Sequence, residues 1–309
     1  MEGKLSVVIP CYNSERNIES VIENDIKIFQ QQGISEYEFI LVNDYSRDNT
    51  WEVIKSISER NKNVIGINLA KNVGQHGAIM AGFHYVNGDF VVVSDDDGQT
   101  QMEAITRMLD KMDEGYDVVT TEWIVKSKRS CIRRFGTKVN DIMNEVLLGA
   151  PKGVELSIFF VARRFVIDEM IKYNNPYPYV TGLFLRVTHN IGSVQVEQLD
   201  RMSGQSGYSF KKLLGLWLNG FTAFSVTPLR VASYIGVFSA LVGFIYGAYI
   251  LLRKILINDI MVGWSSVTAI LLFMSGIILC VLGLIGEYIG RIYISINNAP
   301  QFVIKEISK

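Results

Sequence analysis

Two long segments without charged residues constrain this chain more than any other feature of its sequence. Val231–Leu252 holds 22 consecutive residues without a charged side chain, and Ile260–Gly286 holds 27. An α-helix needs about 20 apolar residues to cross a bilayer, and a soluble core seldom contains an apolar hairpin of this length. The sequence therefore predicts a membrane region over residues 230–290, with two transmembrane helices at about 231–252 and 262–286.

The charges that flank these segments predict their orientation. Two crossings return the chain to its starting side, so the residues before and after the hairpin face one compartment. The cations on that side are Lys211, Lys212, Arg230, Arg291, Lys305 and Lys309. They favour the cytoplasm, and Arg253 and Lys254 in the predicted connecting loop oppose this only weakly. We therefore expect a multi-pass protein of the inner or cell membrane with both termini in the cytoplasm.

The segments next to the predicted hairpin differ in character. Residues 213–229 carry no charge, and Leu214, Trp217, Phe221 and Phe224 fall on one face at helical spacing. We predict amphipathic helices lying in the membrane interface over residues 211–229, with an ordinary core helix as the alternative. Residues 291–309 are expected to form a cytoplasmic C-terminal tail.

Residues 1–210 show short apolar runs that alternate with helical segments. The predicted strands are Leu5–Ile9, Phe39–Val42, Val64–Leu69, Phe90–Ser94, Val118–Thr121, Ser157–Ala162 and Val194–Leu199. The predicted helices are Asn17–Gln32, Thr50–Arg60, Ala78–Val86 and Met102–Glu114. This alternation is typical of an α/β domain with a mostly parallel sheet and right-handed crossovers. The net charge of −1 gives no reason to expect nucleic-acid binding.

Three adjacent carboxylates follow the fourth predicted strand. Asp95, Asp96 and Asp97 stand between Ser94 and Gly98. Adjacent carboxylates repel one another, and a bound hard cation would relieve that repulsion by taking oxygen ligands. The alternative is a solvated acidic turn. Asp44 follows the second predicted strand, so both acidic loops are expected at one sheet edge, beside a crevice that would hold a nucleotide.

Six ordered motifs carry a resemblance to a known family. They are Val7-Val-Ile-Pro10-Cys-Tyr12-Asn13-Ser-Glu15; Val42-Asn-Asp44-Tyr-Ser46-Arg-Asp48-Asn-Thr50; Asn72-Val-Gly74-Gln-His-Gly-Ala78-Ile-Met-Ala81-Gly82; Gly88-Asp89 with Asp95-x-Asp97-x-Gln99; Arg201 with Gly204-x-Ser206-x-Tyr208-Ser209; and Gly286-Glu287-Tyr288-Ile-Gly290-Arg291-Ile-Tyr293. From about residue 4 to its C-terminus, the chain resembles the family-2 glycosyltransferases of the GT-A fold. Within these it is most similar to the polyisoprenyl-phosphate glycosyltransferases, such as bactoprenol glucosyltransferases and dolichol-phosphate mannose synthase relatives.

The resemblance implies an architecture and an activity. The expected fold is α/β, with a Rossmann-like, mostly parallel GT-A domain followed by interfacial helices and two transmembrane helices. The expected activity is an inverting sugar transfer from a nucleotide sugar, with UDP-glucose or a similar UDP-sugar favoured, to undecaprenyl or another polyprenyl phosphate. The product would donate sugars to cell-envelope glycans. Family members often associate through their membrane helices, so a homo-oligomer is expected.

The resemblance also assigns roles at the donor side. Pro10, Tyr12 and Glu15 would line the base and ribose pocket, and Asp44 would accept a hydrogen bond from the nucleobase. Asn72 and Asp96 would also contact the nucleotide. Asp95 and Asp97 would act in catalysis by holding the nucleotide and a Mg²⁺ or Mn²⁺ ion that bridges its diphosphate. Such an ion neutralises charge that develops on the leaving group.

On the acceptor side, the lipid phosphate needs cations and hydroxyl donors. Arg201 is the first candidate, followed by Arg133 and Arg134, with Ser206 and Tyr208 as hydroxyl donors. Arginine suits this task because its guanidinium contacts phosphate through two N–H groups. Arg163 and Arg164 are weaker candidates.

The chain departs from the family pattern at two places. Thr100-Gln101-Met102 stands where relatives carry an acidic or amide residue and two prolines. Ser157 stands where many relatives carry an aspartate thought to act as the base, and Glu155 is the substitute candidate. Three alternatives stay open, and these changes motivate the first of them. They are a catalytically silent membrane scaffold that binds nucleotide sugars, a relative of processive polysaccharide synthases, and a glycosyltransferase with a different acceptor.

Overall fold

The computed structural model describes residues 3–98, 101–124, 149–151, 153–197, 227–257, 263–296 and 300–309. The chain forms two compact units. One consists of Met1–Ser209 together with Asn298–Lys309, and the other of Phe210–Asn297.

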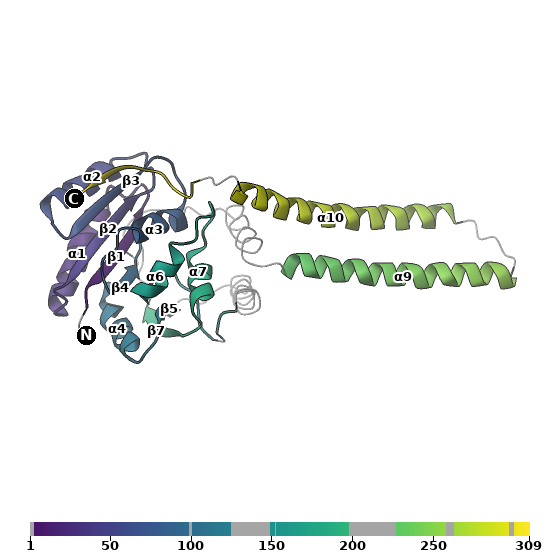
Figure 1. Ribbon diagram of the computed structural model, residues 1–309, viewed down its shortest axis with the longest axis horizontal. Helices are drawn as coiled ribbons and strands as arrows, with labels where there is room; N and C mark the ends of the chain where they lie inside the picture. Colours follow the sequence, from purple (N-terminus) through teal and green to yellow (C-terminus); the bar gives the residue numbers. More distant parts are fainter. Residues whose placement is uncertain are drawn as a thin grey trace. The chain divides into compact units, whose positions relative to one another are not determined.

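The first unit is built on one eight-stranded sheet (Figure 1). Its strands, in the order β7-β5-β6-β4-β1-β2-β3-β8, are Ile191–Glu197, Val118–Ile124, Phe160–Arg163, Phe90–Val93, Leu5–Cys11, Tyr37–Asn43, Val64–Leu69 and Ile304–Ser308. Its helices are α1 (Ile18–Gln31), α2 (Thr50–Arg60), α3 (Gln75–Phe83), η1 (Met102–Ala104), α4 (Ile105–Asp113), α6 (Arg164–Met170) and α7 (Val180–Val187).

The four central strands β4, β1, β2 and β3 are parallel and in register, so their carboxyl ends meet at one edge. Leu5 pairs with Tyr37 of β2 and with Phe90 of β4. Pro10 lies in β1 beyond the last pair with β4, which is Val8 with Val93. Because β4 has ended there, the missing N–H of proline interrupts no ladder.

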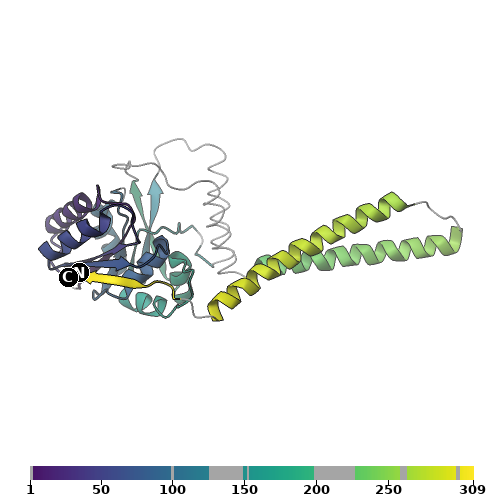
Figure 2. The same cartoon turned by 90° about the horizontal axis from the view of Figure 1, so that it is seen from above.

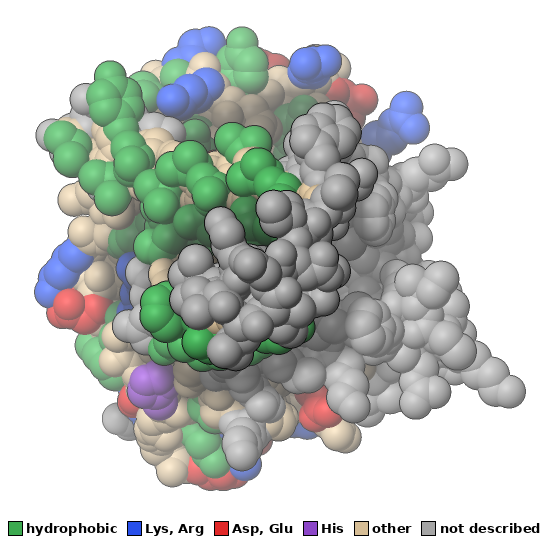
Figure 3. All heavy atoms as spheres, turned by 90° about the vertical axis from the view of Figure 1, so that its right-hand side faces the viewer, with side chains coloured by type: hydrophobic (Ala, Val, Ile, Leu, Met, Phe, Trp, Pro, Cys, Tyr) green, Lys and Arg blue, Asp and Glu red, His purple; other side chains and the backbone are tan. Residues whose placement is uncertain are grey.

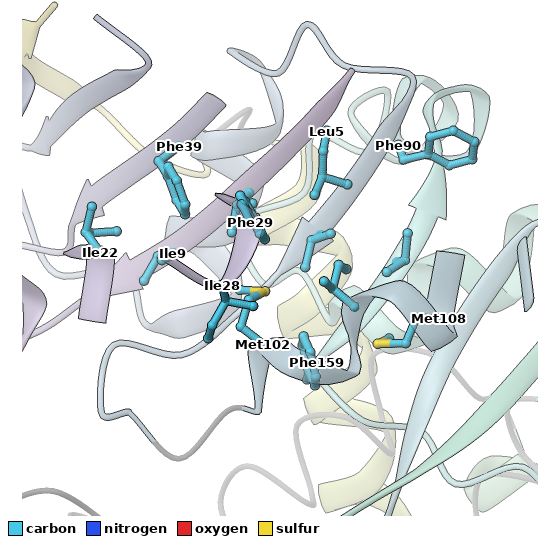
Figure 4. Packing of buried hydrophobic residues seen from close by; sticks show 14 of the residues in the cluster. Leu5, Ile9, Ile22, Ile28, Phe29, Phe39, Phe90, Met102, Met108 and Phe159 are labelled. Carbon is cyan, nitrogen blue, oxygen red and sulfur yellow. The ribbon is translucent and has the colours of Figure 1, made fainter. Parts of the chain in front are cut away.

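The main hydrophobic core lies between the sheet and α1, α2 and α4 (Figure 4). Successive strand residues face opposite sides, so Val7 and Ile9 of β1 join this core while Val8 faces α3. On that other side α3 approaches the sheet closely. A Cβ added at Gly82 would lie 2.5 Å from Cγ1 of Val8.

The sheet is mostly parallel, as expected, and antiparallel pairs occur at its flanks. Strands β6 and β8 are antiparallel to their neighbours, so three of the seven strand pairs among the described residues are antiparallel. Strand β6 begins at Phe160 rather than Ser157, and β7 begins at Ile191, before the predicted start. The apolar runs marked the strands, but their ends depend on pairing with β4 and β5, which lie far away in the sequence.

The C-terminal residues correct one expectation. Residues 291–309 do not form a tail, because α10 continues to Ile296 and residues 304–308 form β8, which pairs with β3. Side chains fix β8 in place. Trp51 donates from Nε1 to Glu306 Oε2 at 3.2 Å, and the hydroxyl groups of Ser58 and Ser308 lie 2.7 Å apart. Residues 304–308 therefore form the edge strand of the sheet, next to β3.

The second unit contains two long helices that run alongside each other, α9 (Thr227–Ile257) and α10 (Trp264–Ile296) (Figures 1 and 2). Both expose large hydrophobic side chains, including Phe244 at 78% and Phe273 at 68%. Hydrophobic side chains also occupy much of the described surface in Figure 3. Within the described residues, only Phe273–Gly290 is long and apolar enough to cross a membrane, while Ala232–Tyr246 in α9 is a shorter apolar stretch.

Candidate functional site

Four loops meet at the carboxyl edge of the sheet. They follow β1, β2, β3 and β4, and hydrogen bonds join each of them to at least one other. The predicted donor-side residues all lie in these loops or, for Pro10, in the strand that leads into one. The sheet topology thus brings together residues from four separate sequence motifs.

Asp96 turns back toward the loop after β1. Its Oδ2 accepts a hydrogen bond from the Tyr12 N–H at 3.0 Å and another from the Ser14 hydroxyl. Burial raises the pKa of Asp96, these two hydrogen bonds offset part of that rise, and the nearby Asp97 adds to it. The extra carboxylate in the acidic run therefore joins two loops.

Asp44 joins the loops after β2 and β3. Its side chain is 3% exposed, and its two oxygens accept the N–H groups of Val73 at 2.7 Å and Gly74 at 2.9 Å. The Asn72 side chain returns a hydrogen bond to the Asp44 carbonyl at 2.9 Å. Burial raises the pKa of Asp44, and the two N–H groups oppose that rise. Each carboxylate oxygen retains a second lone pair for a further donor.

Glu15 and Asp48 fix the beginning of α2. Glu15 Oε2 accepts the Asn49 N–H at 3.0 Å, and Asp48 Oδ2 accepts the Glu15 N–H at 3.3 Å. Thr50 donates from its N–H to Asp48 Oδ1 at 3.1 Å and accepts the Ser14 N–H at its hydroxyl at 2.8 Å. In this structure Glu15 thus orders the loop in which the resemblance places a ribose contact.

Asp95 and Asp97 are half-buried directly beyond β4. The Gln75 side chain, at the first position of α3, donates from Nε2 to Asp95 Oδ1 at 2.8 Å. No cluster of three or more His, Cys, Asp or Glu residues able to hold a metal occurs within the described ranges. This donor set still fits Mg²⁺ or Mn²⁺ in a nucleotide complex, because Mg²⁺ is usually held by one or two carboxylates together with substrate phosphates and water.

Glu155 is half-buried in the irregular segment before β6, not on a strand face. Two residues further on, Ser157 is 8% exposed and makes structural contacts. Its hydroxyl accepts hydrogen bonds from Trp123 Nε1 at 3.1 Å and from the Phe159 N–H at 3.2 Å, while its own N–H donates to Thr120. Ser157 therefore joins this segment to β5 and offers no carboxylate base.

The acceptor-side candidates Arg133, Arg134, Arg201, Ser206 and Tyr208 lie outside the described residues. Two weaker candidates can be placed. Arg163 pairs with Phe90 at the amino end of β4, and its guanidinium donates to the carbonyl groups of Tyr116 and Met112. Arg164 follows it and donates to Asp168 at 2.8 Å. Both lie at the sheet edge opposite the four loops.

Sequence reasoning missed three contributors to the site, namely Ser14, Gln75 and Tyr45. Ser14 and Gln75 each hold one of the acidic residues, yet both read as ordinary residues next to a helix start. Tyr45 is 54% exposed, and its φ of 56° is unusual for a bulky residue. Its place beside Asp44 was the only signal in the sequence.

Comparison with known proteins places the chain among sugar transferases. Residues 6–171 match glycosyl transferase family 2, and residues 227–292 match a family described as the GtrB C-terminal hairpin. The first match spans more than half of the 309 residues.

Several curated relatives match almost the whole chain. An uncharacterised glycosyltransferase of Bacillus subtilis is 35% identical over 97% of this chain and 93% of its own length. An undecaprenyl-phosphate 4-deoxy-4-formamido-L-arabinose transferase of Proteus mirabilis is 34% identical over 99% of this chain and 94% of its own length. A bactoprenol glucosyl transferase of Shigella phage SfII is 31% identical over 98% of both chains.

A solved structure shares the fold at low sequence identity. It is the glucosyl-3-phosphoglycerate synthase of Mycobacterium tuberculosis, in complex with Mn²⁺, UDP-glucose and phosphoglyceric acid. The TM-score is 0.53 and the identity is 18%, over 71% of this chain and 77% of that one.

Proposed function

The chain belongs to glycosyl transferase family 2, and from this premise we propose that it transfers a sugar from a nucleotide sugar to a polyprenyl phosphate at a membrane surface. One observation carries the proposal. The loops after four parallel-sheet strands converge at one edge and bring Tyr12, Asp44, Asp95 and Asp97 together in a unit that continues into a hydrophobic helical hairpin. The names of the relatives that match the whole chain support the acceptor class.

The donor site uses the residues at this edge. Pro10 and Glu15 shape the loop after β1, and the exposed ring of Tyr12 offers a face on which a nucleobase stacks. Asp44 holds the loop that contains Asn72 and Gly74, and its remaining lone pairs accept an imide N–H of a uracil-like base. Hydrogen bonds within the protein thus hold together the loops that would contact the donor.

Asp95 and Asp97 would hold a divalent cation against the donor diphosphate. When bound, Mg²⁺ or Mn²⁺ supplies positive charge where the leaving nucleoside diphosphate becomes more negative. The protein contributes by orientation. Gln75 fixes the carboxylate of Asp95, and Asp96 holds the loop after β1 beside it.

The acceptor phosphate needs positioning more than it needs a base. The second pKa of a phosphate monoester is about 6, so the acceptor is mostly a dianion at neutral pH. Holding the acceptor phosphate in line with the sugar carbon therefore matters more than removing a proton from it. We assign this positioning to Arg201, Arg133 and Arg134 with Ser206 and Tyr208, and keep Glu155 as a candidate for orienting the nucleophile. Transfer inverts the anomeric carbon, so an α-linked donor gives a β-linked lipid phosphate.

Chain connectivity supports a hairpin that crosses the membrane twice. Both ends of the second unit lead into the first unit, because residues 298–309 return to it and β8 pairs with β3. A single crossing by α10 would leave β8 on the other side of the bilayer from its sheet. We therefore propose that α9 crosses as well, which would return the chain to the side of the bilayer that holds the sheet. Residues 211–229 would then lie in the interface and keep the site at headgroup depth.

The sugar itself stays open, because relatives of similar identity are named for different sugars. The deciding experiment incubates the purified full chain with undecaprenyl phosphate, Mn²⁺ or Mg²⁺, and labelled UDP-glucose, UDP-N-acetylglucosamine, UDP-galactose or GDP-mannose. At least one donor should label the lipid. Asp97→Asn should lower turnover about 100-fold or more, whereas Asp89→Asn, an exposed carboxylate at the opposite sheet edge, should not.

Three outcomes would overturn parts of this proposal. Activity that survives both Asp97→Asn and a chelator would refute the metal assignment. Donor binding without transfer to any lipid phosphate would favour the silent binding protein. Transfer to a different acceptor would refute the polyprenyl-phosphate assignment.

A further inference from the structure

Tyr45 is held in a backbone conformation that tyrosine rarely adopts. Its φ of 56° lies in the left-handed region, where Cβ crowds the following carbonyl oxygen. The side chain is 54% exposed, so buried packing does not explain the conformation. Strained residues of this kind persist where the surrounding structure fixes them, and they gather at ligand-binding positions.

Hydrogen bonds made by the residues before and after Tyr45 hold its backbone in this strained conformation. The preceding residue, Asp44, donates from its N–H to the Cys11 carbonyl at 2.9 Å. The following residue, Ser46, donates from its N–H to the Asn43 side chain at 3.3 Å. A glycine would satisfy the same backbone bonds without strain, so the loop itself does not require an aromatic side chain at this position.

A second exposed aromatic residue emerges from the neighbouring loop. Tyr12 is 48% exposed, and the residue after it, Asn13, donates from its N–H to the Ser46 hydroxyl at 3.0 Å. Asn13 also accepts the Arg47 N–H at 3.0 Å. The hydrogen bond between Asn13 and Ser46 therefore joins the two loops directly after Tyr12 and Tyr45.

The strand order places these tyrosines at one end of the site. In the order β4-β1-β2, the acidic run follows β4, Tyr12 follows β1 and Tyr45 follows β2. Strands lie about 4.8 Å apart, so the ends of β4 and β2 are roughly 10 Å apart. A nucleotide with its diphosphate near Asp97 would extend toward β2, which brings its base to the loops of Tyr12 and Tyr45.

From these observations we propose that Tyr45 binds the nucleobase of the donor by stacking its ring on the base. The inference rests on the proposed function, because it takes the ligand to be a nucleotide. A nucleobase is the part of the donor with a flat π-face, and stacking on an aromatic side chain tolerates different bases. Tyr45 thus sets donor affinity, while groups near Asp44 read the edge of the base.

The test separates a binding role from a structural one because the two predict opposite changes in stability. The full-length protein and its variants are titrated with UDP and with GDP by calorimetry, and their thermal unfolding midpoints are measured. Tyr45→Gly should weaken binding of the preferred nucleotide about tenfold or more and leave the unfolding midpoint equal to or above that of the parent. Tyr45→Phe, which keeps the ring, should bind within about twofold.

Phe165→Ala is the matched control, because Phe165 is an aromatic residue of similar exposure, 47%, at the opposite sheet edge. It should leave nucleotide affinity unchanged. If the parent binds a nucleotide and Tyr45→Gly binds it with the same affinity, this inference alone is overturned. A lower unfolding midpoint in Tyr45→Gly than in the parent would overturn it as well. A parent chain that binds neither nucleotide would overturn the proposed function and this inference together.

Discussion

Replacing Asp44 with asparagine tests the most enclosed link between the site loops. The carboxylate accepts two backbone N–H groups, one on each oxygen, and is 3% exposed. An asparagine side chain can accept at only one of these positions and would present an N–H₂ group to a backbone N–H at the other. Asp44→Asn therefore removes one charge-assisted hydrogen bond and leaves buried donors facing each other.

The expected cost follows from these contacts. Leaving a buried polar group without a partner costs about 1–3 kcal/mol. Asparagine is neutral, so its burial does not carry the desolvation cost that raises the pKa of Asp44. This difference offsets part of the lost hydrogen bonding and keeps the net loss of stability within that range. A loss of this size lowers the unfolding midpoint of a domain of about 200 residues by roughly 2–10 °C. It should also weaken UDP binding, because the loop containing Asn72 loses its anchor.

Thermal unfolding of the full chain in detergent, followed by tryptophan fluorescence, measures the first effect, and UDP titration measures the second. Asp89→Asn is the control. Asp89 is exposed and accepts one N–H, from Lys4 at 2.9 Å, so its loss should cost under about 1 kcal/mol and leave UDP affinity unchanged. If Asp44→Asn unfolded like Asp89→Asn and bound UDP like the parent, the argument that Asp44 holds the loop would fail.

Two further predictions concern a buried carboxyl and the candidate base. Burial, with help from Glu103, raises the pKa of Asp25 to about 8, so between about pH 4 and 8 the folded chain holds a proton that the unfolded chain has lost. The free energy of unfolding should therefore fall as pH rises through this range, by up to about 1.4 kcal/mol per pH unit. Asp25→Asn should flatten that slope when unfolding is measured from pH 5 to 8. An equal slope in the variant and the parent would refute the raised pKa of Asp25. Glu155→Gln should lower turnover at saturating donor and acceptor if Glu155 orients the nucleophile, and unchanged turnover would exclude that role.

Local patterns in the sequence were sufficient to predict the centre of the sheet. The runs that became β1 to β4 are apolar and are followed by polar loops, and the predicted bounds Thr50–Arg60 and Val64–Leu69 coincide with α2 and β3. Because parallel strands end at one edge, the sequence also predicted that Asp44 and the acidic run lie at the same edge. These inferences required only periodicity and chain order.

Features that depend on distant partners could not be predicted in this way. Strand β8 is short and carries charged residues, and it forms because β3 offers an unpaired edge and Trp51 and Lys55 bind Glu306. The short helices α6 and α7 were missed for a related reason, since packing against each other and against the sheet stabilises them more than their own sequence does. Neither case leaves a periodic pattern long enough to recognise.

The acidic residues of the site show why composition alone could not assign their roles. In the sequence Asp44, Asp95, Asp96 and Asp97 are four carboxylates beside two strand ends, and any pair could hold a cation. In the structure Asp44 and Asp96 bind backbone N–H groups of neighbouring loops. Their charge therefore stabilises the loop arrangement, and the proposed function assigns the diphosphate-bound cation to Asp95 and Asp97. A variant at Asp96 should consequently disturb the loop of Tyr12 and donor affinity first, whereas a variant at Asp97 should reduce turnover first.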